Sequence, residues 1–167
     1  MKVKVLRCND KVELPSYQTT GSAGFDFIIN NFKIIAVGRY IEGMGMGEEL
    51  ISAHDNTEVE FKPGYRLKIG TGIKMEIPKG YELQVRPRSG MAWNQGITIM
   101  NSPGTIDSDF RGEVDIILVN HGNFNVKLKL GERIAQGVLN KVEQCEWLEE
   151  ALDTTERGSN GFGSTNK

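Results

Sequence analysis

Short segments in which every second residue is hydrophobic dominate this sequence. The clearest covers residues 67–77; a Pro-Lys-Gly turn at 78–80 follows, and the alternation resumes over residues 81–85. The same spacing recurs at residues 3–5, 97–99 and 126–130. A period of two places the apolar side chains on one face of a strand, where they can pack against a core. Many short strands joined by Gly and Pro turns predict an all-β sandwich or barrel.

Other segments depart from this alternation. Two apolar runs, residues 116–119 and 134–139, are typical of strands buried on both faces, although a glycine interrupts the second. Residues 144–153 place Trp147, Leu148, Ala151 and Leu152 at helical spacing, but the segment is short enough to form a strand and a turn instead. Residues 31–58 contain irregularly spaced Gly and Met and are interpreted as a long excursion between two strands.

The charge balance limits the kinds of partner. With 20 Lys and Arg against 22 Asp and Glu, the formal net charge is -2. The chain therefore lacks the basic excess that attracts nucleic acids or anionic membranes. Its 167 residues suffice for one domain. The two cysteines are far apart and the first residues lack the apolar stretch of a signal peptide, which predicts a cytoplasmic protein.

The last residues carry more chemistry than an ordinary chain end. They are polar and Gly-rich, with one large aromatic residue, Phe162. Glycines let backbone N–H groups approach an oxyanion, hydroxyl groups add donors, and the Arg157 guanidinium adds a fixed positive charge. Stacking for a base beside donors for phosphates is what a nucleotide requires. The alternative interpretation is a flexible tail.

Four further polar segments precede this one. The five read AGFD at 23–26, RPRSGMA at 86–92, NSPGTIDSDFRG at 101–112, RIAQ at 133–136 and RGSNGFGSTNK at 157–167. The second is expected to open a short helix, and the third to form a hairpin with an acid at its bend. Each alone is a weak signal. Their order over nearly the whole chain, except residues 31–58, closely resembles the five motifs of the trimeric dUTP diphosphatases, or dUTPases.

The resemblance implies a jelly-roll-like β fold of the β-clip type, assembled as a homotrimer with shared active sites. Residues 1–152 would form the single β-domain, with residues 31–58 as an insertion. Residues 153–167 would form a mobile arm that closes a neighbouring subunit's active site. The implied reaction is the Mg²⁺-assisted hydrolysis of dUTP to dUMP and pyrophosphate, which keeps uracil out of DNA and supplies dUMP for dTMP synthesis. The implied location is the cytoplasm, or the host cytoplasm if a phage or virus encodes the chain.

The resemblance also assigns residues to the phosphates and the metal. Asp107 matches the acid that orients and activates the water attacking the α-phosphorus. Asp26 matches a carboxylate that reaches Mg²⁺ through a metal-bound water. The matches to phosphate-binding residues are Arg88, Ser89, Gly90 and Gln136, and in the C-terminal loop Arg157, Gly163, Ser164 and Thr165.

The nucleoside is assigned in the same way. Phe162 matches the aromatic residue that stacks on uracil, and Phe110 stands beneath the deoxyribose where many members have Tyr. The segment that pairs with the pyrimidine edge, leaving no room for a 5-methyl group, is matched by Asn101, Gly104, Thr105, Ile106 and Asp107. Two further residues depart from the family pattern: Gly137 stands in place of a bulkier apolar residue, and Asn166 in place of a glycine. Both departures are expected to have little effect.

Three other interpretations stay open. A dCTP deaminase shares the core and the 101–112 segment but lacks the closing C-terminal loop. A nucleotide-gated regulator would bind dUTP mainly to switch a partner interface, and a structural jelly roll would not need the five polar motifs. Separately, the Gly- and Met-rich insertion at 31–58 is a candidate contact surface for another protein, since Met side chains adapt to varied partners.

Overall fold

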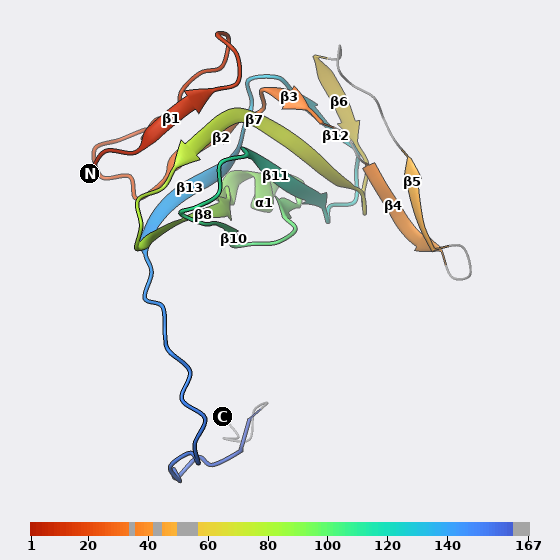
Figure 1. The fold of residues 1–167 in the computed structure, drawn as a ribbon. Coiled ribbons are helices and arrows are strands. Elements are labelled where there is room, and N and C mark those ends of the chain that lie inside the picture. The colour runs from red at the N-terminus through yellow and green to blue at the C-terminus, as the bar shows by residue number, and fades with distance from the viewer. Residues whose placement is uncertain (34–35, 42–44, 50–56, 162–167) are drawn as a thin grey trace.

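The computed structural model describes residues 1–33, 36–41, 45–49 and 57–161, and their regular secondary structure is almost entirely strand (Figure 1). Thirteen strands and one short helix lie within them. The strands form three sheets of seven, four and two strands. The predicted all-β class is therefore confirmed. No helix among the described residues combines the length and apolar character needed to cross a membrane.

The large sheet is organised around its longest strand, β7 (Arg66–Glu76). On one side β7 pairs with β11 (Glu113–Asn120), which pairs in turn with β9 (Ile97–Ile99). Its other neighbours are β1 (Lys4–Arg7), β3 (Asn31–Phe32) and β4 (Ala36–Ile41), and β5 (Gly45–Glu49) extends the sheet beyond β4. All these pairings are antiparallel, as expected for a sandwich of short strands.

The four-stranded sheet carries most of the polar motifs. Its order is β10 (Gly104–Ile106), β8 (Tyr81–Pro87), β13 (Arg133–Lys141) and β2 (Phe25–Ile28). The small sheet pairs β12 (Val126–Lys129) with β6 (Glu58–Phe61). The helix α1 (Ser89–Gln95) follows β8 directly, as predicted, and ends at Gly96, whose φ of 68° suits a glycine at a helix C-terminus.

One hydrophobic core joins the three sheets. Phe27 of β2, Ile69 of β7 and Leu128 of β12 belong to one buried cluster, and each is at most 1% exposed. Along β7 the predicted alternation is confirmed: the buried apolar residues are Leu67, Ile69, Ile73 and Met75, with Ile77 just beyond the strand. The predicted turn is present as well, because the Tyr81 N–H donates to the Pro78 carbonyl at 3.1 Å and Gly80 has a φ of 81°.

Three local expectations were wrong. Ile117 is 37% exposed, so residues 116–119 are not buried on both faces. Residues 101–112 do not form a self-contained hairpin, because β10 pairs with β8, its neighbour in the four-stranded sheet. Residues 144–153 form neither helix nor strand, and the extended C-terminal segment (residues 143–161) leaves the body after β13 (Figure 1). The pairing of β10 with β8 joins residues about twenty positions apart, which a local pattern does not record.

The segment 31–58 is more regular than expected. It contains β3, β4 and β5, and it leads into β6. The backbone of β4 pairs with β5 from Ala36↔Glu49 to Ile41↔Gly45, and Val37 pairs with Arg66 of β7. The three strands β3, β4 and β5 of this insertion therefore extend the large sheet. Residues 34–35, 42–44 and 50–56 lie outside the described part of the chain.

Candidate active site

A row of polar residues crosses three strands of the four-stranded sheet. Gln136 on β13 lies directly opposite Asp26 on β2 and directly opposite Arg86 on β8. Residues paired in this way point to the same face of an antiparallel sheet. The neighbouring residues on β2, Phe25 and Phe27, turn to the core instead. The strand period thus places three polar side chains together on the outer face.

Asp26 is the buried end of this row and is only 7% exposed. Its Oδ2 accepts a hydrogen bond from Arg133 Nη1 at 3.1 Å, and its Oδ1 lies 3.5 Å from Arg88 Nε. Arg88 Nη1 also donates to the Arg133 carbonyl at 2.8 Å. The two arginines therefore hold each other and the carboxylate in one arrangement. The sequence assignment had included Asp26 and Arg88 but missed Arg133, whose only signal was its place at the start of the 133–136 motif.

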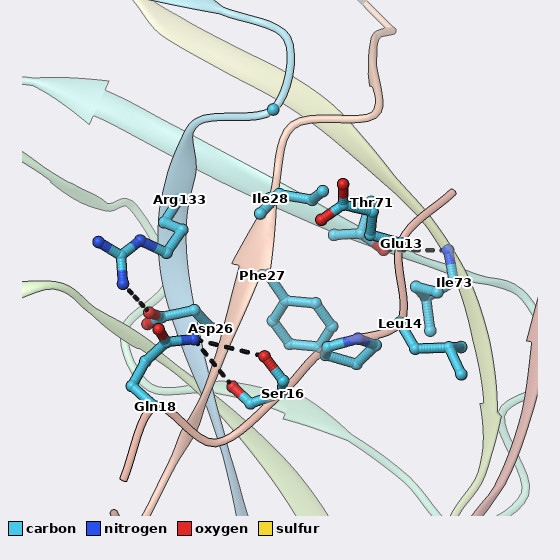
Figure 2. A pocket seen from close by; sticks show the side chains of 12 residues that line it. Glu13, Leu14, Ser16, Gln18, Asp26, Phe27, Ile28, Thr71, Ile73 and Arg133 are labelled. Carbon is cyan, nitrogen blue, oxygen red and sulfur yellow. Dashed lines mark hydrogen bonds and ion pairs between the residues drawn. The ribbon is translucent and has the colours of Figure 1, made fainter. Parts of the chain in front are cut away.

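A cavity of about 210 Å³ lies beside this cluster (Figure 2). Figure 2 shows Asp26, Arg133 and Gln18 at one end of it and Thr71 at the other, with the Phe27 ring between them. The Asp26 N–H donates to the Ser16 carbonyl at 3.4 Å, so the segment before the first motif is held over β2. Nothing in the sequence had indicated a role for Ser16 or Gln18.

The second group of predicted residues lies at the other edge of the sheet. Gly104 pairs with Val85 and Ile106 with Leu83, which places Asp107 just beyond the end of β10. Asp107 lines an open cleft of about 1010 Å³, whose other walls include Tyr81, Glu82, Thr105, Asp109 and Arg111. Because β10 ends the strand order of this sheet, its outer edge has no strand partner among the described residues.

Side chains around Asp107 shape this edge. The Phe110 N–H donates to the Asp107 carbonyl at 3.2 Å. The Phe110 ring is 40% exposed and covers Gly112, where a Cβ atom would lie 2.5 Å from Phe110 Cζ. On the inner side, a Cβ atom on Gly104 would lie 3.4 Å from Asn101 Nδ2. Asn101 therefore lies beside Gly104, Asp107 follows the end of β10, and the exposed Phe110 ring comes three residues later.

The two groups do not meet within one chain. β2 and β10 are the outer strands of a four-stranded sheet, so three spacings of about 4.8 Å, about 14 Å in all, separate their axes. Asp26 and Asp107 also line different cavities. Arg157 lies on the extended C-terminal segment and donates from Nε to the Asn160 carbonyl at 2.9 Å. The other predicted residues of the tail, Phe162, Gly163, Ser164 and Thr165, lie outside the described residues, as does Asn166.

The residues around Asp26 suit one mode of binding a magnesium ion. No group of three or more His, Cys, Asp or Glu side chains is placed to hold a metal ion within the described ranges. Both oxygens of Asp26 already face guanidinium groups. Mg²⁺ keeps several waters and is usually held by substrate phosphates with one or two carboxylates, not by a protein cage. The donor set therefore fits an ion that arrives with phosphates and that Asp26 contacts through water.

Comparisons with known proteins agree with this geometry. The dUTPase family model matches residues 51–166. A deoxyuridine 5'-triphosphate nucleotidohydrolase of Nautilia profundicola is 45% identical over 168 residues, covering all of both chains. Its counterpart in Fusobacterium nucleatum is also 45% identical, covering all of this chain and 98% of its own. Among solved structures, Staphylococcus bacteriophage 80alpha dUTPase with dUPNHPP aligns over 99% of both chains with a TM-score of 0.74 at 20% identity, which supports the fold.

The family match begins at residue 51, but the bacterial alignments run from end to end and so include Asp26 and the 31–58 segment. The family model matches more than half of the chain, and the two bacterial relatives are 45% identical to it along its whole length. The described motif residues lie on or beside one sheet. This chain therefore belongs to the dUTPase family.

Proposed function

We propose that this protein hydrolyses dUTP to dUMP and pyrophosphate. The observation that carries the proposal is the placement of four separate motifs on one sheet, in a chain 45% identical along its length to deoxyuridine 5'-triphosphate nucleotidohydrolases. One edge of this sheet offers arginines, an amide and a carboxylate, and the other offers an exposed acid beside an unpaired strand edge. These are the groups that a nucleoside triphosphate requires.

Asp107 is the proposed general base. Its carboxylate accepts a proton from a water molecule as the water oxygen attacks the α-phosphorus. The bond between the α-phosphorus and the bridging oxygen to the β-phosphate breaks, and pyrophosphate leaves with that oxygen and its electron pair. The exposed position of Asp107 in an open cleft leaves room for both the water and the phosphate. Positioning an in-line attack supplies much of the catalysis in reactions of this kind.

The phosphates are assigned to the β2 side of the four-stranded sheet, opposite β10. Arg88, Ser89, Gly90 and Gln136 would hold them, since guanidinium and amide groups donate to phosphate oxygens. Mg²⁺ bound to those phosphates would supply charge neutralisation, and Asp26 would hold it through water. Asp26 also keeps Arg88 in place, because the two are paired in this structure.

Uracil is assigned to β10. The free edge of this strand presents backbone N–H and C=O groups, which can pair with the polar edge of a pyrimidine, and Asn101 adds a side-chain amide. A site that hydrogen-bonds one base edge rejects bases that would leave its donors unpaired. The exposed Phe110 ring offers a surface beneath the deoxyribose. Phe110 lacks the phenol oxygen of Tyr, but its ring face is retained, so we expect discrimination against UTP.

A complete site would need more than one copy of the chain. Asp26 and Asp107 line different cavities, and the extended C-terminal segment leaves its own domain (Figure 1). The proposal is therefore a homotrimer in which the 153–167 arm, with Arg157, Phe162, Gly163, Ser164 and Thr165, closes over a neighbour's site. Exposed free Cys8 and Cys145 are consistent with a reducing cytoplasm.

The insertion supports a separate proposal. Among the described residues, β5 is the outer strand of the large sheet on the β4 side, and a strand edge of this kind can pair with another protein. Deleting residues 38–56 would test this partner surface. Loss of a co-purifying protein with unchanged catalysis would support it, whereas no loss would leave the segment a surface extension of the sheet.

The test of the enzymatic proposal is pyrophosphate release from dUTP with Mg²⁺, run beside dCTP, dTTP and UTP. We expect selective turnover of dUTP, and Asp107→Asn should lower kcat by about 10²–10⁴-fold, the range for loss of a general base. Asp109→Asn is the matched control, because Asp109 is an exposed acid two residues away in the same cleft. Ammonia release from dCTP would indicate the deaminase, and tight dUTP binding without turnover would favour the regulator.

A further inference from the structure

Arg86 lies inside the polar row but has no assigned role. It is exposed on β8, directly opposite Gln136, and Gln136 is directly opposite Asp26. The three side chains therefore share the outer face of the sheet. Side chains directly opposite each other on neighbouring strands have Cβ atoms about 5 Å apart, well within the reach of an arginine. Whatever anion contacts Gln136 is consequently within reach of Arg86.

The guanidinium of Arg86 is held in a defined orientation. Its Nε and Nη2 both donate to Gln84 Oε1, at 3.1 and 2.6 Å. Gln84 Nε2 donates in turn to Glu82 Oε1 at 2.7 Å. Glu82, Gln84 and Arg86 are spaced by two along β8, so they line up on one face of the strand. A side chain braced in this way loses less conformational freedom when it binds a ligand.

Most of the hydrogen-bonding capacity of Arg86 is unused. An arginine carries five N–H donors, of which Gln84 takes two. None of the ion pairs found among the described residues involves Arg86, although Arg88 and Arg133 both pair with Asp26. The row thus contains one oriented guanidinium without a carboxylate partner, next to the amide assigned to the phosphates.

We propose that Arg86 binds the terminal phosphates of the substrate, and the pyrophosphate product, beside Gln136. This inference rests on the proposed function, because it adds a contact to the same site. Guanidinium groups bind phosphates through paired, charge-assisted hydrogen bonds. A residue that contacts only the terminal phosphates distinguishes a triphosphate from a monophosphate, and Gln84 acts as its positioning residue.

The experiment is calorimetric titration of the full-length protein, with Mg²⁺ present, using dUPNHPP, pyrophosphate and dUMP as ligands. Arg86→Met should weaken binding of dUPNHPP and of pyrophosphate at least tenfold and leave dUMP binding unchanged. Arg86→Lys should bind both ligands more tightly than Arg86→Met, because lysine keeps the positive charge but lacks the paired N–H donors of the guanidinium. Gln84→Met should give a smaller loss of the same kind. Arg7→Met is the matched control, since Arg7 is exposed on β1 of the large sheet.

Four results would overturn the inference. Equal affinity of wild type and Arg86→Met for pyrophosphate would show that the contact is absent. An equal loss for dUMP would indicate general damage to the site. A changed oligomeric state of Arg86→Met in sedimentation would assign the guanidinium to an acid of a neighbouring subunit. If the wild-type protein neither turns over dUTP nor binds dUPNHPP, the proposed function fails as well, and the wild-type data alone reveal this.

Discussion

The carboxylate of Asp26 lies between two guanidinium groups and is almost fully buried. Arg88 approaches it from the junction between β8 and α1, and Arg133 from the start of β13; the two are joined through the Arg133 carbonyl. Asp26 therefore has a structural role that does not depend on metal. A carboxylate whose only role was to contact metal-bound water would contribute little to folding when no metal is present.

Asp26→Asn separates these two roles. In the absence of Mg²⁺ we expect it to lower the free energy of unfolding by about 1–3 kcal/mol, because two guanidinium groups lose their counter-charge at a buried acceptor. Urea denaturation measured by circular dichroism gives the value. Asp153→Asn, at an exposed position in the extended C-terminal segment, should change stability by less than about 0.5 kcal/mol. An unchanged midpoint for Asp26→Asn would assign the residue to metal contact alone.

In strand β13, Gly137 leaves room for two aromatic rings of the neighbouring strand β2. A Cβ atom on Gly137 would lie 2.5 Å from Phe25 Cε2 and 2.9 Å from Phe27 Cε2. The two rings, whose centroids are 5.3 Å apart, fill the space that a larger residue at 137 would occupy. A glycine at position 137 is therefore expected to have little effect only because Phe25 and Phe27 of β2 fill the space that a larger residue would occupy.

Gly137→Leu should consequently destabilise the protein by about 1–3 kcal/mol, the usual cost of overpacking a well-filled core. Thermal unfolding monitored by calorimetry would measure it. Gly21→Ala is the control, because no atom lies within 4 Å of the added Cβ position. Combining Gly137→Leu with Phe25→Leu should recover part of the loss. A Gly137→Leu protein as stable as wild type would show that the Phe25 ring moves aside without cost.

In the single chain, the extended C-terminal segment exposes large apolar side chains to solvent. Trp147 is 93% exposed and Leu152 94% exposed, and the segment runs away from the body (Figure 1). Large apolar side chains on an extended, unpaired segment are typical of a surface that another copy covers. This agrees with the proposal that the site is divided between subunits.

Trp147→Ser should therefore weaken assembly at least tenfold, since burying a Trp side chain contributes more than the about 1.4 kcal/mol that corresponds to a factor of ten. Sedimentation velocity over a dilution series would measure the association. Glu149→Gln, an exposed polar change in the same segment, should leave it unchanged. Identical association of the wild-type and Trp147→Ser proteins would exclude residues around 147 from the subunit contact.

Most of the strands were predictable because their signal is local. The alternation over residues 67–77 depends only on neighbouring residues, and so does the turn that ends in Gly80. The motif residues were assigned on a different ground, because their order along the chain is specific to one family. The strands within 36–49 were not recognised, because irregularly placed glycines disguise their period of two. Ile117 was expected to be buried because it lies in an apolar run. Its exposure shows that burial also depends on what covers the strand from outside, which the run does not record.

The sequence therefore predicted the fold class, the places of the main strands and the family, and it assigned the residues proposed to carry its chemistry. Which of these residues meet is visible only in the folded chain. Arg133 reaches Asp26 across 107 positions of the chain, β10 joins β8 instead of closing a hairpin, and Arg86 stands beside Gln136. Strand pairing and its register bring together residues that are far apart in the chain, and no local pattern records them.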